Sequence, residues 1–158
     1  MSPFRRRALY GAGLAAALTA GTVLVGCGSD GPAAVARLSV VDSYIPAPAS
    51  PGGMAAGYLT VRNTGAGSDE LIAVRSPGAS SVTMHRSTER TMEEVPSLPV
   101  PANGELQLAR GGNHLMIMGW TKAPVVGDRL ELELTFAKGE TIAVQVPVES
   151  LTYRPGSK

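Results

Sequence analysis

The chain has 158 residues, which is enough for one domain once a targeting segment is set aside. Its formal charge of +1 includes three leader arginines, so the chain from Cys27 onward has 11 basic against 13 acidic residues, a net charge of −2. This balance provides no basic surface for nucleic acid, and we expect no nucleic-acid partner. A single cysteine excludes an intrachain disulfide.

The first 26 residues have the pattern of a signal peptide, with a basic region at Arg5 to Arg7 and a small-residue apolar stretch to Val25. Residues 24–27, Leu-Val-Gly-Cys, resemble the lipobox of bacterial lipoproteins, in which cleavage leaves the cysteine as the lipid-bearing first residue. We expect Cys27 to be lipidated, because nothing around it would pack as a core. Residues 27–36 are then a flexible tether, and the protein lies lipid-anchored on the extracytoplasmic face of a bacterial cell membrane.

Residues 37–150 are expected to form an all-β domain, followed by a flexible tail over residues 151–158. The strongest pattern is the alternation of apolar and polar residues from Leu130 to Phe136 and from Ile142 to Val148, on either side of a Lys138-Gly139 turn. Asn103-Gly104 predicts another hairpin turn. Seven or eight short strands predict a small Greek-key β-sandwich, with strands expected near residues 38–45, 58–62, 71–74, 81–86, 105–108, 111–120, 130–136 and 142–148.

The apolar stretch from Gly111 to Trp120 carries a histidine and two thioethers. On an extended strand His114, Met116 and Met118 share one face. The other histidine, His85, has Met92 seven residues after it. Imidazole and thioether donors without a thiolate suit monovalent copper better than zinc, calcium or magnesium. A blue-copper electron-transfer centre is disfavoured, because it needs a cysteine ligand and the single cysteine, Cys27, is the expected lipid anchor.

Methionine also fills β-sheet cores without any metal role. For Met84 and Met118, a core role and a ligand role both remain open. Met54 lies in a loop, and we expect no metal role for it.

The pattern His85-x6-Met92-x21-His114-x-Met116 resembles the copper-binding motif of the PCuAC-type extracytoplasmic copper chaperones, usually spaced His-x10-Met-x21-His-x-Met. The similarity extends to Tyr58–Gly65 and to the Arg-Gly-Gly sequence before the second histidine. It implies a cupredoxin-like sandwich that binds one Cu(I) through His85, Met92, His114 and Met116. Because the first interval is four residues shorter than usual, Met84 or Met118 is an alternative to Met92.

The resemblance further implies delivery of copper to the binuclear copper centre of cytochrome c oxidase. The expected partners are the copper-bearing subunit of the oxidase or a thioredoxin-like copper protein. Two alternatives are a copper-scavenging or resistance lipoprotein, and a metal-free β-sandwich scaffold or adhesion lipoprotein. We expect no enzyme, because neither a His-Glu-x-x-His metalloprotease motif nor a phosphate-binding glycine loop is recognisable in the sequence.

Overall fold

The computed structural model describes residues 33–156, and all its regular elements are strands in that part of the chain. This confirms the predicted all-β class. The leader, Cys27 and residues 157–158 lie outside the described residues. Ten strands are present there: β1 (Leu38–Pro46), β2 (Ala55–Asn63), β3 (Asp69–Arg75), β4 (Ala79–Ser87), β5 (Met92–Glu94), β6 (Leu98–Val100), β7 (Gly104–Leu108), β8 (Asn113–Trp120), β9 (Arg129–Phe136) and β10 (Thr141–Glu149). Between residues 33 and 156, no helix is long and apolar enough to span a bilayer.

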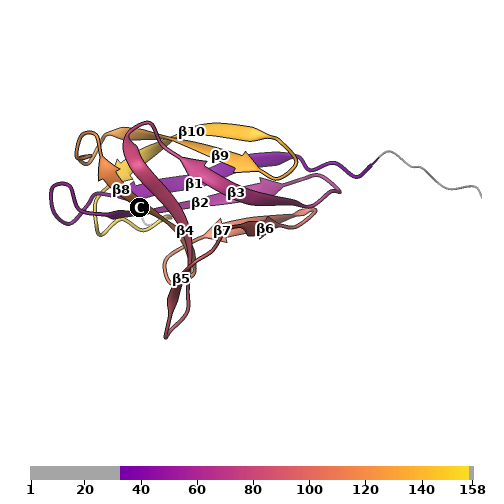
Figure 1. The fold of residues 1–158 in the computed structure, drawn as a ribbon, viewed down its shortest axis with the longest axis horizontal. Helices are drawn as coiled ribbons and strands as arrows, with labels where there is room; N and C mark the ends of the chain where they lie inside the picture. The colour runs from indigo at the N-terminus through magenta and orange to yellow at the C-terminus, as the bar shows by residue number, and fades with distance from the viewer. Residues whose placement is uncertain (1–32, 157–158) are drawn as a thin grey trace, which may run out of the picture. The chain divides into compact units, whose positions relative to one another are not determined.

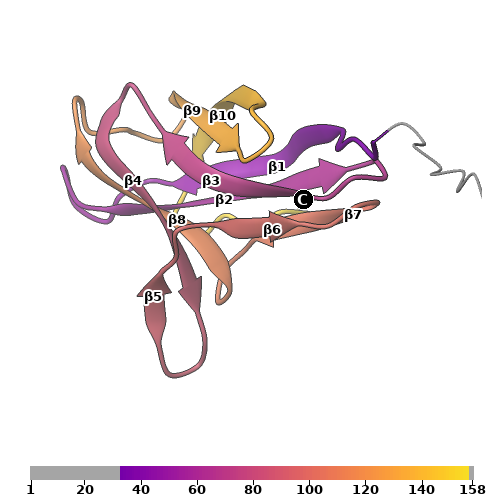
Figure 2. The ribbon, with the colours of Figure 1, turned by 45° about the vertical axis from the view of Figure 1, so that its right-hand side comes forward.

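The strands form a continuous hydrogen-bonded path in the order β5-β4-β8-β2-β1-β10-β9-β3-β6, with β7 added to β2 (Figure 1). β1 joins the two halves of this path, because it pairs antiparallel with β2 and, at Ile45 and Pro46, parallel with β10. The sheet folds over at this point, and strands β10, β9 and β3 lie over the layer that contains β2 and β8 (Figures 1 and 2). The result is a β-sandwich with one core between its layers.

Alternating residues of both layers build that core. Leu115 and Ile117 of β8 are fully buried, and so are Leu132 and Leu134 of β9. Each such side chain contributes about 1.5–3 kcal/mol when it leaves water. The hairpin predicted from the last alternating pattern is confirmed, since β9 and β10 pair in register from Thr141 to Pro147.

The strand count is higher than the predicted seven or eight, because residues 92–100 contribute two short strands outside the predicted ranges. The prolines of this segment exclude a regular central strand there. β6 accommodates Pro99 because it lies at the edge of the sheet, where a strand tolerates a residue without an N–H. Leu98 and Val100 on either side of this proline are fully buried. β5 has no buried side chain, since all three of its residues are exposed, and its sequence shows no alternation of apolar and polar residues.

The hairpin predicted at Asn103-Gly104 is wrong, although the turn itself forms. Asn103 adopts the left-handed conformation (φ 49°) that favours Asn and Gly in such turns. The strands on either side do not pair with each other, because β6 pairs with β3 and β7 pairs with β2. The turn therefore carries the chain from one layer of the sandwich to the other.

The side chain of Asn63 fastens the segments at this end of the domain. Its Oδ1 accepts hydrogen bonds from the N–H groups of Arg37 (3.0 Å) and Gly65 (2.9 Å). Its Nδ2 donates to the carbonyl oxygens of Gly67 (2.7 Å) and Pro101 (3.0 Å). Because the residue is buried, these four bonds satisfy an amide that would otherwise be costly.

We predict that a side chain at Gly119 disturbs the close contact of β4 and β8. It has a φ of 66°, and a Cβ at this position would lie 1.8 Å from Oγ of Ser80. Gly127 is a matched control, because its φ is 97° but nothing lies within 4 Å of the added carbon. Gly119→Ala should lower the free energy of unfolding by about 2–3 kcal/mol, and Gly127→Ala by about 1 kcal/mol. Urea unfolding measures both, and equal losses would show that the contact with Ser80 is unimportant.

Candidate metal site

The two histidines lie side by side on neighbouring strands. His85 of β4 is directly opposite His114 of β8, and their rings are 5.7 Å apart between centroids and inclined by 22°. Met116 lies two residues further along β8, opposite Thr83 of β4. Residues directly opposite each other in an antiparallel pair point to the same face, as do residues two apart on one strand. Both imidazoles and the Met116 thioether therefore share one face.

Met92 reaches the same face from β5. It is opposite Ser87 of β4, which is two residues from His85 and so points to the same side. The β4–β5 hairpin extends away from the rest of the sandwich (Figures 1 and 2). The Met92 side chain is 57% exposed. The structure thus brings all four predicted ligands to one face, with Met92 on its outer hairpin.

A backbone contact fixes the protonation pattern of His114. The Nδ1 atom lies 3.0 Å from the carbonyl oxygen of Gly112, and a carbonyl can only accept a hydrogen bond. Nδ1 therefore carries the proton, and Nε2 keeps its lone pair. Only 7% of the residue is exposed. A hydrogen bond to one ring nitrogen commonly orients a metal-binding histidine and leaves the other nitrogen to bind the ion.

His85 has a buried nitrogen without a partner. Its Nε2 lies 2.9 Å from Oγ1 of Thr83, whereas its Nδ1 is buried and has no hydrogen-bond partner in the described part of the chain. A buried polar atom left in this state costs about 1–3 kcal/mol. When Nε2–H donates to Thr83, the Nδ1 lone pair is free to bind a metal ion. The donor set on this face, two imidazoles and two thioethers, suits the soft ion Cu(I).

Harder metal ions find less support in this geometry. Within residues 33–156, no three His, Cys, Asp or Glu side chains lie close enough together to hold a metal ion. The methionine sulfur atoms are the other soft donors on the face that carries the two histidines.

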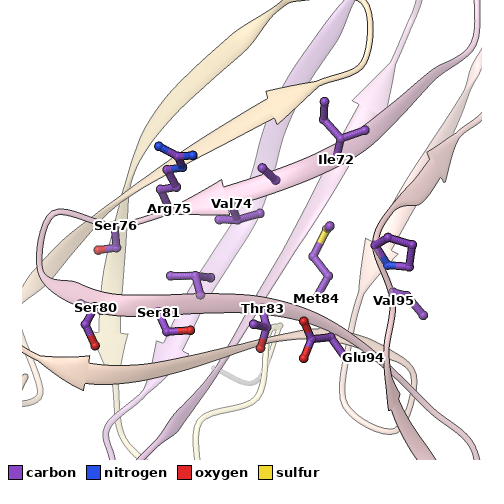
Figure 3. A pocket seen from close by; sticks show the side chains of 14 residues that line it. Ile72, Val74, Arg75, Ser76, Ser80, Ser81, Thr83, Met84, Glu94 and Val95 are labelled. Carbon is purple, nitrogen blue, oxygen red and sulfur yellow. The ribbon is translucent and has the colours of Figure 1, made fainter.

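Met84 lies on the other face of β4 from the histidines. It is opposite Leu115 and is only 6% exposed. Figure 3 shows its side chain pointing toward Ile72, while Thr83 points to the opposite side. The cavity that Met84 lines, between β3 and β4, has a volume of about 610 Å³ and contains no histidine. Met84 is therefore a core residue, and its placement does not favour it as a replacement for Met92.

Met118 lies on the histidine face, opposite Ser81 of β4. It is one step further along β8 than Met116, so Met116 lies between it and the histidine pair. Because Met118 is on the histidine face, a ligand role remains open for it. It is, however, further from His114 along the strand than Met116 is.

Sequence reasoning missed two groups that orient the imidazoles, Thr83 and the Gly112 carbonyl. Each lies two residues before the histidine it contacts. Residues two apart on a strand lie on the same face, and this spacing was the sequence signal that could have indicated them. It also missed the placement of Glu94, which β5 brings opposite His85. No pattern in the sequence shows that pairing.

A cluster of aromatic residues holds the loop that supplies the Gly112 carbonyl. The Arg110 guanidinium lies 5.4 Å from the ring centre of Tyr58, and Tyr58 in turn lies 5.1 Å from Tyr44. Tyr153, in the segment after β10, packs edge-on against Tyr44 at 5.0 Å. Burial raises the pKa of the Tyr58 hydroxyl, and the positive charge of Arg110 opposes this rise. The loop that precedes His114 is therefore attached to β2 through Arg110.

Comparison with known proteins places this geometry in a family context. The family model described as "Putative lipoprotein LpqE-like" matches residues 38–148. The "Putative lipoprotein Lxx21020" of Leifsonia xyli subsp. xyli (strain CTCB07) is 38% identical over 106 residues, which is 63% of this chain and 63% of the relative. The chain thus spans less than two thirds of the length of that relative.

Solved structures with a similar fold include PCuAC domains. The apo PCuAC domain from PmoF1 is 25% identical, with a TM-score of 0.64 over 72% of this chain and 94% of that one. The Cu(I) form of DR1885 from Deinococcus radiodurans is 28% identical, with a TM-score of 0.59 over 78% of this chain and 85% of that one. A copper-bound PCuAC domain from PmoF2, 24% identical, shows the same fold. The cupredoxin-like sandwich and the resemblance to PCuAC-type chaperones are confirmed.

We predict that metal-free His114 is the Nδ1-protonated tautomer. In the neutral imidazole, the contact with the Gly112 carbonyl can form only if Nδ1 carries the hydrogen. Long-range proton–nitrogen correlation spectra of the imidazoles measure the tautomer directly. Protonation of Nε2 instead would remove this nitrogen as the donor of His114.

Proposed function

Because the chain belongs to the LpqE-like lipoprotein family and has the fold of PCuAC domains, we propose that it is an extracytoplasmic Cu(I)-binding copper chaperone. The observation that carries this proposal is the unpartnered Nδ1 of His85 beside His114, on a face that also presents thioethers. The copper-containing relatives DR1885 and the PmoF2 domain support the choice of ion.

In this proposal His85, Met92, His114 and Met116 hold the ion, His85 through Nδ1 and His114 through Nε2. All four donors are neutral, so Cu(I) keeps its positive charge in the complex and binds less tightly than it would to thiolates. Thioethers need no deprotonation and form no disulfides, which suits a compartment where thiols oxidise. Moderate affinity is appropriate for a protein that must release its ion.

We further propose that the ion goes to the binuclear copper centre of cytochrome c oxidase, through its copper-bearing subunit or a thioredoxin-like copper protein. The exposed position of Met92 supports transfer, because an incoming ligand can displace an accessible donor first. Scavenging would use the same site, and a transfer assay to such a partner separates it from delivery. A metal-free scaffold lipoprotein would leave the buried Nδ1 of His85 without a purpose.

The proposed location is the extracytoplasmic face of the membrane, with Cys27 as the lipid-bearing residue. The lipoprotein family supports this proposal, although Cys27 lies outside the described residues. Residues 1–26 would be the signal peptide and residues 27–36 the tether. The final residues of that segment lie along the β2–β3 turn, where the Val35 carbonyl accepts a hydrogen bond from the N–H of Gly67.

Replacing Met92 tests the ligand set. Met92→Leu keeps the size and apolarity of an exposed side chain, so folding should survive while Cu(I) affinity falls at least about tenfold, or ~1.4 kcal/mol. Met118→Leu should have a much smaller effect. Competition with a Cu(I) chelator measures both variants in a Cys27→Ala background, which removes the competing thiol.

If Met118→Leu proves to be the more damaging of the two, the ion is bound by β8 rather than by the hairpin. Loss of affinity in neither variant would remove both thioethers from the site.

Membrane attachment should depend on Cys27, because this residue is the only cysteine and follows Leu-Val-Gly. Cys27→Ala should release or mislocalise the protein without unfolding the domain, whose strands begin at Leu38. Membrane fractionation measures the attachment, and the circular dichroism of the purified variant checks the fold. Unchanged fractionation would argue against the anchor.

A further inference from the structure

The methionines of this domain are distributed unevenly over its two faces. Of the six in the sequence, five lie in the described residues, and of these only Met84 is in the core. Met92, Met116 and Met118 lie on the histidine face. Met54 is 60% exposed, although methionine is usually buried. Its exposure therefore needs a reason other than core packing.

The register of β2 against β8 places Met54 beside Met118. Ala55 is opposite Ile117 and Ala56 is opposite Met116. Met54 directly precedes β2, and the same register, continued by one residue, brings it opposite Met118. Cβ atoms of residues directly opposite each other are about 4.5–5.5 Å apart, within easy reach for two flexible thioethers.

Two further observations place Met54, one by the side of the sheet and the other by the contact of its segment with β8. Ala55 is 5% exposed and belongs to the core, so the alternation of side chains directs Met54 to the opposite, histidine-bearing face. The indole Nε1–H of Trp120 donates to the carbonyl oxygen of Gly53 at 2.6 Å. This bond holds the segment before β2 against the end of β8. Met54 is thus attached to β8 on both sides of its position.

We propose that Met54 and Met118 form a second site, made of thioethers alone, for a soft monovalent cation. The inference rests on the proposed Cu(I) function and extends it, because Met116 lies between this pair and the histidines. Soft closed-shell ions such as Cu(I) and Ag(I) accept thioether ligands in low coordination numbers. Without an imidazole, the pair binds such an ion more weakly than the histidine site. It is a loading point from which the ion passes to Met116.

The test uses Ag(I), which is not oxidised in air, and the full chain with Cys27→Ala, so that no thiol competes. Methionine methyl groups labelled with carbon-13 report on each thioether separately, and leucine variants assign their signals. The first equivalent of Ag(I) should shift the signals of Met92 and Met116. The second should shift those of Met54 and Met118, with an affinity at least about tenfold weaker. Met84 is the internal control, since it faces the core.

The matched variants are Met54→Leu and Met84→Leu. Met54→Leu should reduce the capacity from two ions to one and change the affinity for the first ion less than about threefold, whereas Met84→Leu should retain both ions. Signals of Met54 and Met118 that stay fixed while those of Met92 and Met116 respond would overturn the second site and leave the proposed function intact. A first ion that shifts neither the Met92 nor the Met116 signal would instead overturn the proposed function.

Discussion

The pairing of β4 with β8 brings both histidines and Met116 to the candidate metal face. It runs without a bulge from Ala79 opposite Trp120 to Arg86 opposite Asn113, and it places His85 opposite His114. A slip of one residue would turn every side chain of one strand to the other face. On β8 that slip would turn Leu115 and Ile117, which are fully buried, away from the core and would turn His114 and Met116 into it. The core on one face thus fixes the donors on the other.

The donors themselves carry a local cost that the fold must offset. The unpartnered Nδ1 of His85 is surrounded by protein, and a buried nitrogen in this state lowers stability by an amount similar to a lost hydrogen bond. The residues around it do the opposite, since Thr83 and the Gly112 carbonyl each bind a ring nitrogen and restrict the orientation of the imidazoles. Preorganised rings with an unsatisfied lone pair are characteristic of a site that a ligand completes.

The sequence predicted those parts of the structure that local patterns determine. The face shared by His114, Met116 and Met118 follows from strand alternation, and the β9–β10 hairpin follows from two alternating runs around a turn. Contacts between distant segments were not predictable in the same way. Nothing near His85 specifies His114 as its opposite residue, and the three exposed residues of β5 have no apolar pattern. At Asn103-Gly104 the turn chemistry was right, but turn chemistry does not specify which strands pair.

The hairpin geometry also explains why a shortened interval between His85 and Met92 leaves Met92 on the histidine face. The hairpin closes through Thr88 and Thr91, and the strands pair from Ser87 opposite Met92 to His85 opposite Glu94. When four residues are removed from a hairpin, two from each arm, every remaining pair keeps its partner. Each pair also stays on the same face of the sheet, because side chains alternate between the two faces with a period of two residues. A methionine that is opposite the residue two after the histidine therefore stays on the histidine face at both lengths. An odd change in one arm would turn the thioether away, so the parity of the deletion matters more than its size.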